Sequence, residues 1–307
     1  RPDFTVKITD FFKSMRIYNL ARLVVFYFRE KLNSAGVQKL WERCRGVQGA
    51  RTLLDCVHQG YAFAAPVETE ETLKRTIEAE PLNEGARISL GWVYLNEGKT
   101  ALAEESFKKA LSINPQSDSA LGGLGSVYRQ ETRYDLAEEM LHRALALNDR
   151  NQSLYVTLGL VCQEQKQYRR AEEAFRQAVG IDPADENVHI HLGYLYRIQK
   201  KFSEAEASFG KAISINPKHV EVYLELGWVY LEQGKFDLAE GLLRKALSLD
   251  PENDSVHAAL GSLYTEQGKF TQAEIEFKRS LALNPDNDVA CVDLALLYCQ
   301  QGAFGPA

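Results

Sequence analysis

The chain has 307 residues, of which 45% are hydrophobic and 25% are charged, and its formal net charge at pH 7 is −6. This composition is typical of an ordinary soluble protein and shows no enrichment that would favour β-sheet. The acidic balance and the lack of a basic stripe argue against nucleic acid as a partner, because nucleic acids bind clustered Lys and Arg side chains.

Residues 1–49 differ in charge from the rest of the chain. They contain ten Lys and Arg and four Asp and Glu, a net charge of +6, which leaves −12 for residues 50–307. A dense apolar run covers residues 17–28, but Arg22 interrupts it, and the run is shorter than the roughly 20 residues that a membrane-spanning helix needs. We therefore expect a basic, apolar helical segment that does not cross a membrane.

Three interpretations of this N-terminal segment stay open. The helix packs on the first of the repeated units described below or on an upstream domain outside these residues, or it lies on an anionic membrane surface through residues 8–32. In the third interpretation it docks into an acidic groove, either of its own chain or of a second copy. Apolar residues fall nearly all round the helix, which favours burial in protein over a one-faced membrane helix.

Residues 50–81 are predicted to be a degenerate copy of the unit that repeats from residue 82 onward, or a cap on its N-terminal side. Thr69 followed by two glutamates is a favourable helix start, because the hydroxyl can accept a backbone N–H and acidic side chains suit the helix dipole. Leu73, Ile77 and Pro81 each stand one period before an apolar residue or a proline of the first clear unit.

A Leu–Gly pair recurs every 34 residues in the rest of the chain, residues 82–307, and a fixed period of this length predicts a solenoid of repeated units. The pairs are Leu90-Gly91, Leu124-Gly125, Leu158-Gly159, Leu192-Gly193, Leu226-Gly227 and Leu260-Gly261, and the register continues at Leu294-Ala295. A tyrosine follows each glycine by three residues, except at Cys162. An alanine follows the glycine by twelve residues, Phe or Leu follows that alanine by four, and a proline ends most units.

These residues resemble the tetratricopeptide repeat, whose pattern is W-x2-L-G-x2-Y, then A-x3-F, then P. The resemblance covers residues 82–307 as six repeats plus a truncated seventh. It implies an all-α fold, a right-handed superhelical solenoid of helix-turn-helix 34-residue repeats. It also implies a protein-interaction scaffold, because stacked repeats present a long concave surface instead of one closed pocket.

Each unit reads as two amphipathic helices joined by a short turn. In the fifth unit the apolar residues of Tyr223–Tyr230 fall on one helix face, Gly234 is placed to adopt a positive φ in the turn, and Pro251 ends the second helix. By the resemblance, positions such as Gly193 and Ala205 mark the closest approach of the two helices. We expect a larger side chain at either position to push the helix pair apart.

By the same resemblance, a concave groove is lined by one side of the first helix of each unit. The candidate ligand-binding residues on that side are Ile88, Trp92, Leu95, Arg129, Val156, Leu160, Ile190, Tyr194, Arg197, Leu224, Trp228 and Leu231. Aromatic residues beside aliphatic residues and arginines are typical of a protein-binding hot spot. We expect the groove to hold an apolar or amphipathic peptide segment, with Arg129 and Arg197 pairing with its carboxylates. The alternative is that these residues only contact the next unit.

The sequence contains no recognisable catalytic, metal-binding or cofactor-binding pattern, such as a Gly-rich phosphate loop, G-x-S-x-G or H-E-x-x-H. His189 and His191 face different ways on a helix, and His189 shares its repeat position with tyrosines, which predicts a packing role. Acidic pairs such as Glu104-Glu105 are expected on the solvated outer face of the second helices. The cysteines are odd in number, lack zinc-ligand spacing and indicate reduced thiols; they are Cys44, Cys56, Cys162, Cys291 and Cys299.

The sequence starts at Arg1 and ends within the second helix of the seventh unit, so we expect a fragment of a longer protein. The predicted function is a non-catalytic scaffold that binds a protein or peptide, with its own N-terminal helix or another copy of itself as further candidate partners. The alternative is a docking or regulatory repeat region of a larger multidomain enzyme whose catalytic domain lies outside these residues. Reduced cysteines favour a cytoplasmic location.

Overall fold

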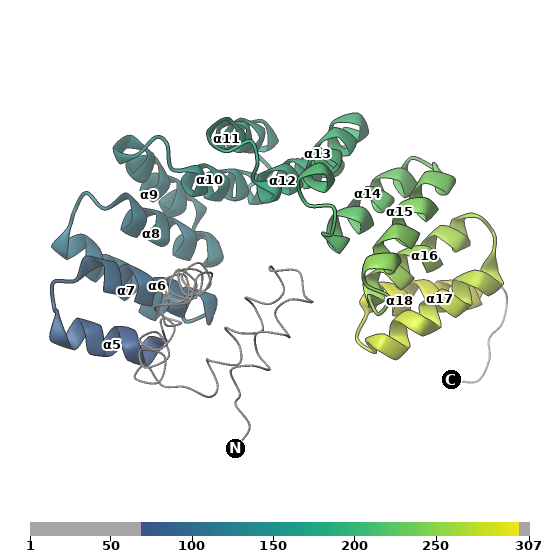
Figure 1. Ribbon diagram of the computed structural model, residues 1–307, viewed down its shortest axis with the longest axis horizontal. Helices are drawn as coiled ribbons and strands as arrows, with labels where there is room; N and C mark the ends of the chain where they lie inside the picture. The colour runs from purple at the N-terminus through teal and green to yellow at the C-terminus, as the bar shows by residue number, and fades with distance from the viewer. Residues whose placement is uncertain (1–68, 301–307) are drawn as a thin grey trace, which may run out of the picture. The chain divides into compact units, whose positions relative to one another are not determined.

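The computed structural model describes residues 69–300, and the chain divides into two compact units at Pro81–Leu82. Of the first unit it describes helix α5 (Glu70–Ala79) (Figure 1). The Thr69 side chain accepts the backbone N–H of Thr72, so the predicted helix start is confirmed. The interpretations of residues 1–49, and the predictions for residues 50–68, lie outside the described residues.

The second unit is built from helix pairs, and every regular element between residues 69 and 300 is an α-helix. The first helices of the repeats are α6 (Glu84–Asn96), α8 (Asp118–Gln130), α10 (Gln152–Glu164), α12 (Glu186–Ile198), α14 (Val220–Glu232), α16 (Asp254–Glu266) and α18 (Asp288–Gln300). The second helices are α7 (Thr100–Ile113), α9 (Tyr134–Leu147), α11 (Tyr168–Ile181), α13 (Phe202–Ile215), α15 (Phe236–Leu249) and α17 (Phe270–Leu283). The predicted all-α repeat solenoid is therefore confirmed.

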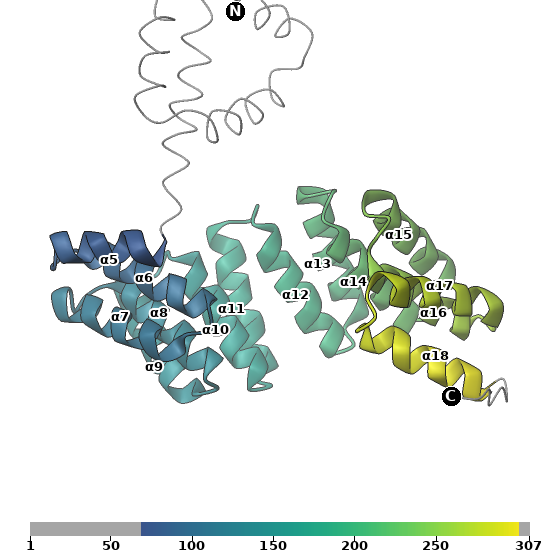
Figure 2. The same ribbon diagram turned by 90° about the horizontal axis from the view of Figure 1, so that it is seen from below.

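Within the second unit the helices stand in two rows along an arc. The first helices form the inner row and the second helices form the outer row (Figure 1). Figure 2 shows the successive pairs stacked side by side in chain order. No single pair can bury its apolar face alone, so this stacking supplies the core.

The core of each pair is a bulky side chain of the second helix that lies against a glycine of the first. Phe107, Phe175, Phe209 and Phe277 are completely buried. A Cβ atom built on Gly193 would stand 2.5 Å from the ring of Phe209. That distance is too short for any carbon contact, so the predicted close approach at Gly193 is confirmed.

We expect Gly193→Ala to lower the free energy of unfolding by about 1–3 kcal/mol, because the buried Phe209 ring cannot yield to the new methyl group. Gly227→Ala is the matched comparison, since its Cβ would meet the branched end of Leu243 at 3.0 Å. Leu243 can shift, and alanine favours a helix over glycine by about 1 kcal/mol. Urea unfolding followed by circular dichroism measures both changes, and an equally large loss at Gly227 would contradict this explanation.

The turn inside each pair requires a left-handed backbone conformation. Glycine fills this position at Gly98, Gly234 and Gly268, with φ between 70° and 72°, which confirms the prediction for Gly234. The second, third and fourth repeats place other residues there, namely Thr132 (φ 58°), Lys166 (φ 61°) and Lys200 (φ 56°). A residue with a Cβ is strained in this conformation, so these three turns lower the stability of the folded chain.

We expect Lys166→Gly to raise the free energy of unfolding by about 1 kcal/mol, because glycine removes the left-handed strain. Lys211→Gly, in the exposed face of α13, is the control and should lower stability by about 1 kcal/mol, because glycine weakens a helix interior. Thermal and urea unfolding of both variants check the two signs. A loss of stability in Lys166→Gly would show that the turn is unstrained.

Successive repeats are joined by a hydrogen bond from the repeat tyrosine to a glutamate of the preceding second helix. The pairs are Tyr128–Glu104 at 2.9 Å, Tyr196–Glu172 at 3.0 Å, Tyr264–Glu240 at 3.0 Å and Tyr298–Glu274 at 2.7 Å. The expectation of a solvated outer face therefore holds for Glu105, which is exposed, but is wrong for Glu104. The cause is the stacking distance, which brings Tyr128 within reach of Glu104.

The contact between α9 and α10 departs from this pattern because Cys162 replaces the tyrosine. Glu138 instead accepts a hydrogen bond from Gln165 at 2.9 Å and forms an ion pair with Arg170 at 2.5 Å. Cys162 is buried, and burial raises the pKa of its thiol. Glu138 therefore still bonds to the following repeat, through Gln165 and Arg170 in place of a tyrosine hydroxyl.

A second set of hydrogen bonds ties the two ends of a repeat together. An asparagine after the second helix donates to the acidic residue that opens the first helix, as in Asn114–Glu84 (3.0 Å), Asn148–Asp118 (2.8 Å), Asn216–Glu186 (3.1 Å) and Asn284–Asp254 (3.0 Å). Where the first helix opens with Gln152 or Val220, the asparagine is replaced by Asp182 or Asp250. The two positions therefore change together, as expected of a donor and its acceptor.

Candidate protein-binding surface

The twelve candidate residues all lie on first helices, from α6 to α14, and so belong to the inner row of the second unit. Trp92 is 37% exposed, and Leu95 is buried at 9%. The remaining ten are half-buried. We use the name inner face for these twelve residues together with six others of the first helices. The six are Glu164 on α10, Ile198 on α12, Glu221, Glu225 and Glu232 on α14, and Glu266 on α16.

The two tryptophans of the inner face are held at one edge by the core. The Trp92 ring meets the Phe107 ring edge-on, with centroids 5.4 Å apart and planes at 76°. Trp228 packs against the buried cluster that contains Tyr223, Ala239 and Leu243. Both indoles are therefore fixed in position while part of each stays accessible, which suits a preorganised contact surface. Whether they bind a partner stays a prediction.

Tyr194, Glu225, Arg197 and Glu232 form a polar cluster between α12 and α14. Arg197 is paired with Glu225, and its Nε lies 3.3 Å from a carboxylate oxygen of Glu232. Burial raises the pKa of Tyr194 to about 12, and the neighbouring Glu225 adds to the effect. Burial also raises the pKa of Glu225, although Arg197 opposes that rise. These contacts join α12 to α14, the first helices of two successive repeats.

Both arginines of the inner face are already used inside the chain. Arg129 on α8 lies 2.8 Å from Glu164 on α10, and Arg197 is shared by Glu225 and Glu232. Pairing of these arginines with the carboxylates of a partner therefore stays a prediction, and a partner would compete there with these glutamates. The cause of the ion pairs is again the stacking distance, which places each arginine against the glutamates of the following first helix.

Sequence reasoning missed Ile198, which is 53% exposed and follows Arg197 on α12. The same register position holds polar or charged residues elsewhere, such as Asn96, Glu164 and Glu266. Comparing the repeats position by position would have shown this single apolar departure. Ile198 adds exposed apolar surface beside Tyr194 on the same helix.

The structure gives no sign of metal chemistry in the part of the chain that it describes. His191 stacks on Phe175, with ring centroids 5.5 Å apart, and burial, helped by Arg129, lowers its pKa. His189 is buried, which confirms its predicted packing role, and its Nε2 lies 3.0 Å from the carbonyl oxygen of Pro183. No group of metal-ligating side chains occurs between residues 69 and 300, and no helix there is long and apolar enough to cross a membrane.

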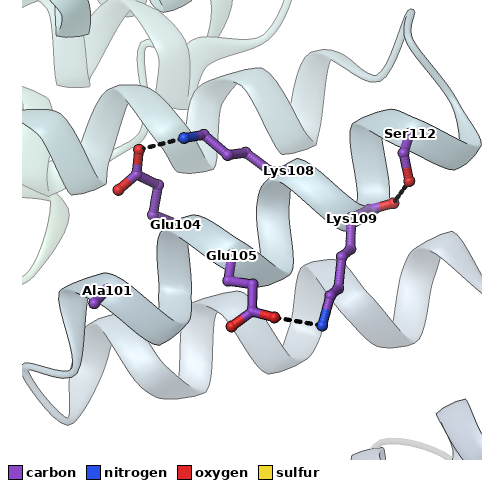
Figure 3. A pocket seen from close by; sticks show the side chains of 6 residues that line it. All are labelled: Ala101, Glu104, Glu105, Lys108, Lys109 and Ser112. Carbon is purple, nitrogen blue, oxygen red and sulfur yellow. Dashed lines mark hydrogen bonds and ion pairs between the residues drawn. The ribbon is translucent and has the colours of Figure 1, made fainter.

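An open hollow over α7 is lined by residues of that helix alone (Figure 3). Its charged side chains neutralise one another: Glu104 pairs with Lys108 at 2.7 Å and Glu105 pairs with Lys109 at 2.5 Å. One helix face with satisfied ion pairs has no converging polar groups, so the hollow offers no chemistry for a ligand.

The stacked helix pairs define a tetratricopeptide-repeat solenoid, a class that is typically a non-catalytic protein-interaction scaffold. The chain belongs to the family described as the cilia and flagella-associated protein 70 C-terminal domain, whose model matches residues 30–295. Among curated proteins, no relative matches the chain.

Solved structures of other repeat proteins share the fold. A chain of the APC/C hetero-tetramer Cut9–Hcn1 is 20% identical with a TM-score of 0.62; the match covers 90% of this chain and 54%, or about half, of that chain. PilF of Pseudomonas aeruginosa is 24% identical with a TM-score of 0.60, covering 71% and 97% of the two chains. A tetratricopeptide repeat protein from Parabacteroides merdae is 22% identical with a TM-score of 0.57, covering 85% and 98%.

The raised pKa of Glu225 predicts a defined pH dependence of stability. Because the folded chain binds this proton more tightly than the unfolded chain, the stability that Glu225 contributes is greatest below its ordinary pKa and is lost as pH rises through the raised value. The Glu225→Gln variant does not lose stability in this way, because glutamine does not ionise. We expect its stability relative to the unmodified protein to improve between about pH 4 and about pH 7. Urea unfolding at both pH values measures the difference, and a relative stability that falls with pH would contradict it.

Proposed function

We propose that the inner face binds an apolar or amphipathic peptide segment of a partner protein and that the chain acts as a non-catalytic scaffold. The observation that carries the proposal is the exposed apolar surface of Trp92 and Ile198 on the inner row. Accessible aromatic side chains beside aliphatic ones on one surface are typical of protein-binding hot spots. The rigid indole and phenol rings of Trp92, Trp228 and Tyr194 lose little conformational entropy on binding.

The other sequence-based predictions concern partners and setting, and they stay predictions. If the chain is the docking or regulatory region of a larger enzyme, it would bind through the same surface. No described residue favours that alternative over a free-standing scaffold. These predictions also include the N-terminal segment or a second copy as occupant, contact with a membrane surface, and a cytoplasmic location.

The proposal is tested with peptides selected from a random library for binding to the full chain. We expect Trp92→Ala combined with Trp228→Ala to weaken the selected peptides by at least about tenfold, because central aromatic residues dominate such interfaces. Ile198→Ser should weaken them as well, and its exposure makes it safe for the fold. Isothermal titration calorimetry gives the affinities, and circular dichroism confirms the helix content of each variant.

The matched control is Phe270→Ala on the outer row, because Phe270 is 38% exposed, almost the same as Trp92. It should leave the affinity unchanged. Equal losses from Phe270→Ala and from the inner-face variants, or no loss from the tryptophan pair, would refute binding at the inner face.

A further inference from the structure

The acidic residues of the inner face are concentrated on α14. Glu221, Glu225 and Glu232 stand on this helix together with Leu224, Trp228 and Leu231. The Glu221 side chain is 65% exposed and the Glu232 side chain is 34% exposed, whereas Glu225 is 17% exposed. Apolar side chains and accessible carboxylates therefore alternate along one helix of the inner row.

Positive charge is nearly absent from helices α12, α14 and α16. Across α12, α14 and α16, Arg197 is the one Lys or Arg in the sequence. It serves Glu225 and Glu232 together, so a single guanidinium faces two carboxylates. The Nε2 atom of His219 lies 3.4 Å from a carboxylate oxygen of Glu221.

The next first helix adds to this excess. Glu266 is exposed at the end of α16, at the register position that Glu232 occupies on α14. The remaining acids of these helices, Glu186 and Asp254, accept hydrogen bonds from Asn216 and Asn284 at the other end of each helix. Glu221, Glu232 and Glu266 are therefore the accessible carboxylates, and Arg197, shared between Glu225 and Glu232, is the one Lys or Arg that these three helices supply.

We propose that the segment bound at α12, α14 and α16 is a cationic amphipathic peptide segment of a partner protein. Its apolar side chains contact Ile198, Trp228 and Leu231, and its Lys or Arg side chains pair with Glu221, Glu232 and Glu266. This inference rests on the proposed function and names the chemistry of the ligand.

Electrostatics favours a cationic segment over an anionic one on two grounds. The surplus carboxylates repel one another and any approaching carboxylate, and a cation relieves this repulsion. Arg197 already faces two carboxylates, so a third carboxylate from a partner would gain little net attraction there. The long stems of Lys and Arg also pack along apolar surface while their charged ends reach outward, which fits the alternation on α14. Charge of this kind acts mainly on the rate of association and weakens with salt.

The test uses two amphipathic helical peptides with the same leucine positions, one with lysine and one with glutamate at the polar positions. Binding to the full chain is measured by calorimetry at low and at high salt. We expect the Leu–Lys peptide to bind at least about tenfold more tightly than the Leu–Glu peptide at low salt, with the difference shrinking at high salt.

Charge-removing variants locate the effect. Glu232→Gln with Glu266→Gln should weaken the Leu–Lys peptide by about fivefold, the range expected for two accessible ion pairs. Glu139→Gln with Glu173→Gln is the control, because both residues are exposed on the outer row and the net charge changes equally. The control pair should leave the affinity unchanged.

The outcomes separate the two proposals. Equal affinity for both peptides, abolished by Trp228→Ala, overturns the charge inference and leaves binding at the inner face intact. Equal weakening by the control pair and the inner pair assigns the attraction to the net charge of the whole chain and also overturns the inference. Failure of both peptides to bind at low salt counts against the charge inference and the proposed function together.

Discussion

In the second unit, the two helices of most repeats approach so closely at one glycine that the neighbouring Phe or Leu side chain leaves no room for a Cβ. Gly193 against Phe209 and Gly261 against Phe277 are examples, each with a would-be Cβ 2.5 Å from the ring. This contact fixes the distance and rotation of the pair, because a buried ring cannot be compressed. The rotation decides which side of the first helix faces the core, and therefore which residues form the inner face.

The contacts between repeats depend on that geometry in turn. Once each pair has a fixed thickness, the next first helix arrives at a fixed distance, and Tyr196 reaches Glu172 while Arg197 reaches Glu225. Stability in such an array sums over neighbouring interfaces. The α9–α10 contact shows that the bond is kept even when its usual donor is lost, since Arg170 and Gln165 replace the hydroxyl that Cys162 lacks.

The same stacking explains the character of the inner face. Arginines on α8 and α12 are drawn into ion pairs with the following helix, so the surface that remains accessible is apolar and acidic. Its rings are fixed by the core, as in the edge-on contact of Tyr194 with Phe209 at 5.6 Å between centroids. A surface with rigid rings and accessible carboxylates distinguishes ligands by charge as well as by apolar shape.

The helices, the turns and the core positions could be predicted from the sequence, because they follow from periodicity and from residues close together in the chain. Gly234 in its turn, and Gly193 against its partner helix, were predicted on that basis. The tertiary structure alone decided the burial of Leu95, the partners of Arg129 and Arg197, and the bond of Glu104 to Tyr128. These contacts join residues 24 to 35 positions apart. Their reach depends on how repeats stack in space, which a repeating pattern of residue types does not specify.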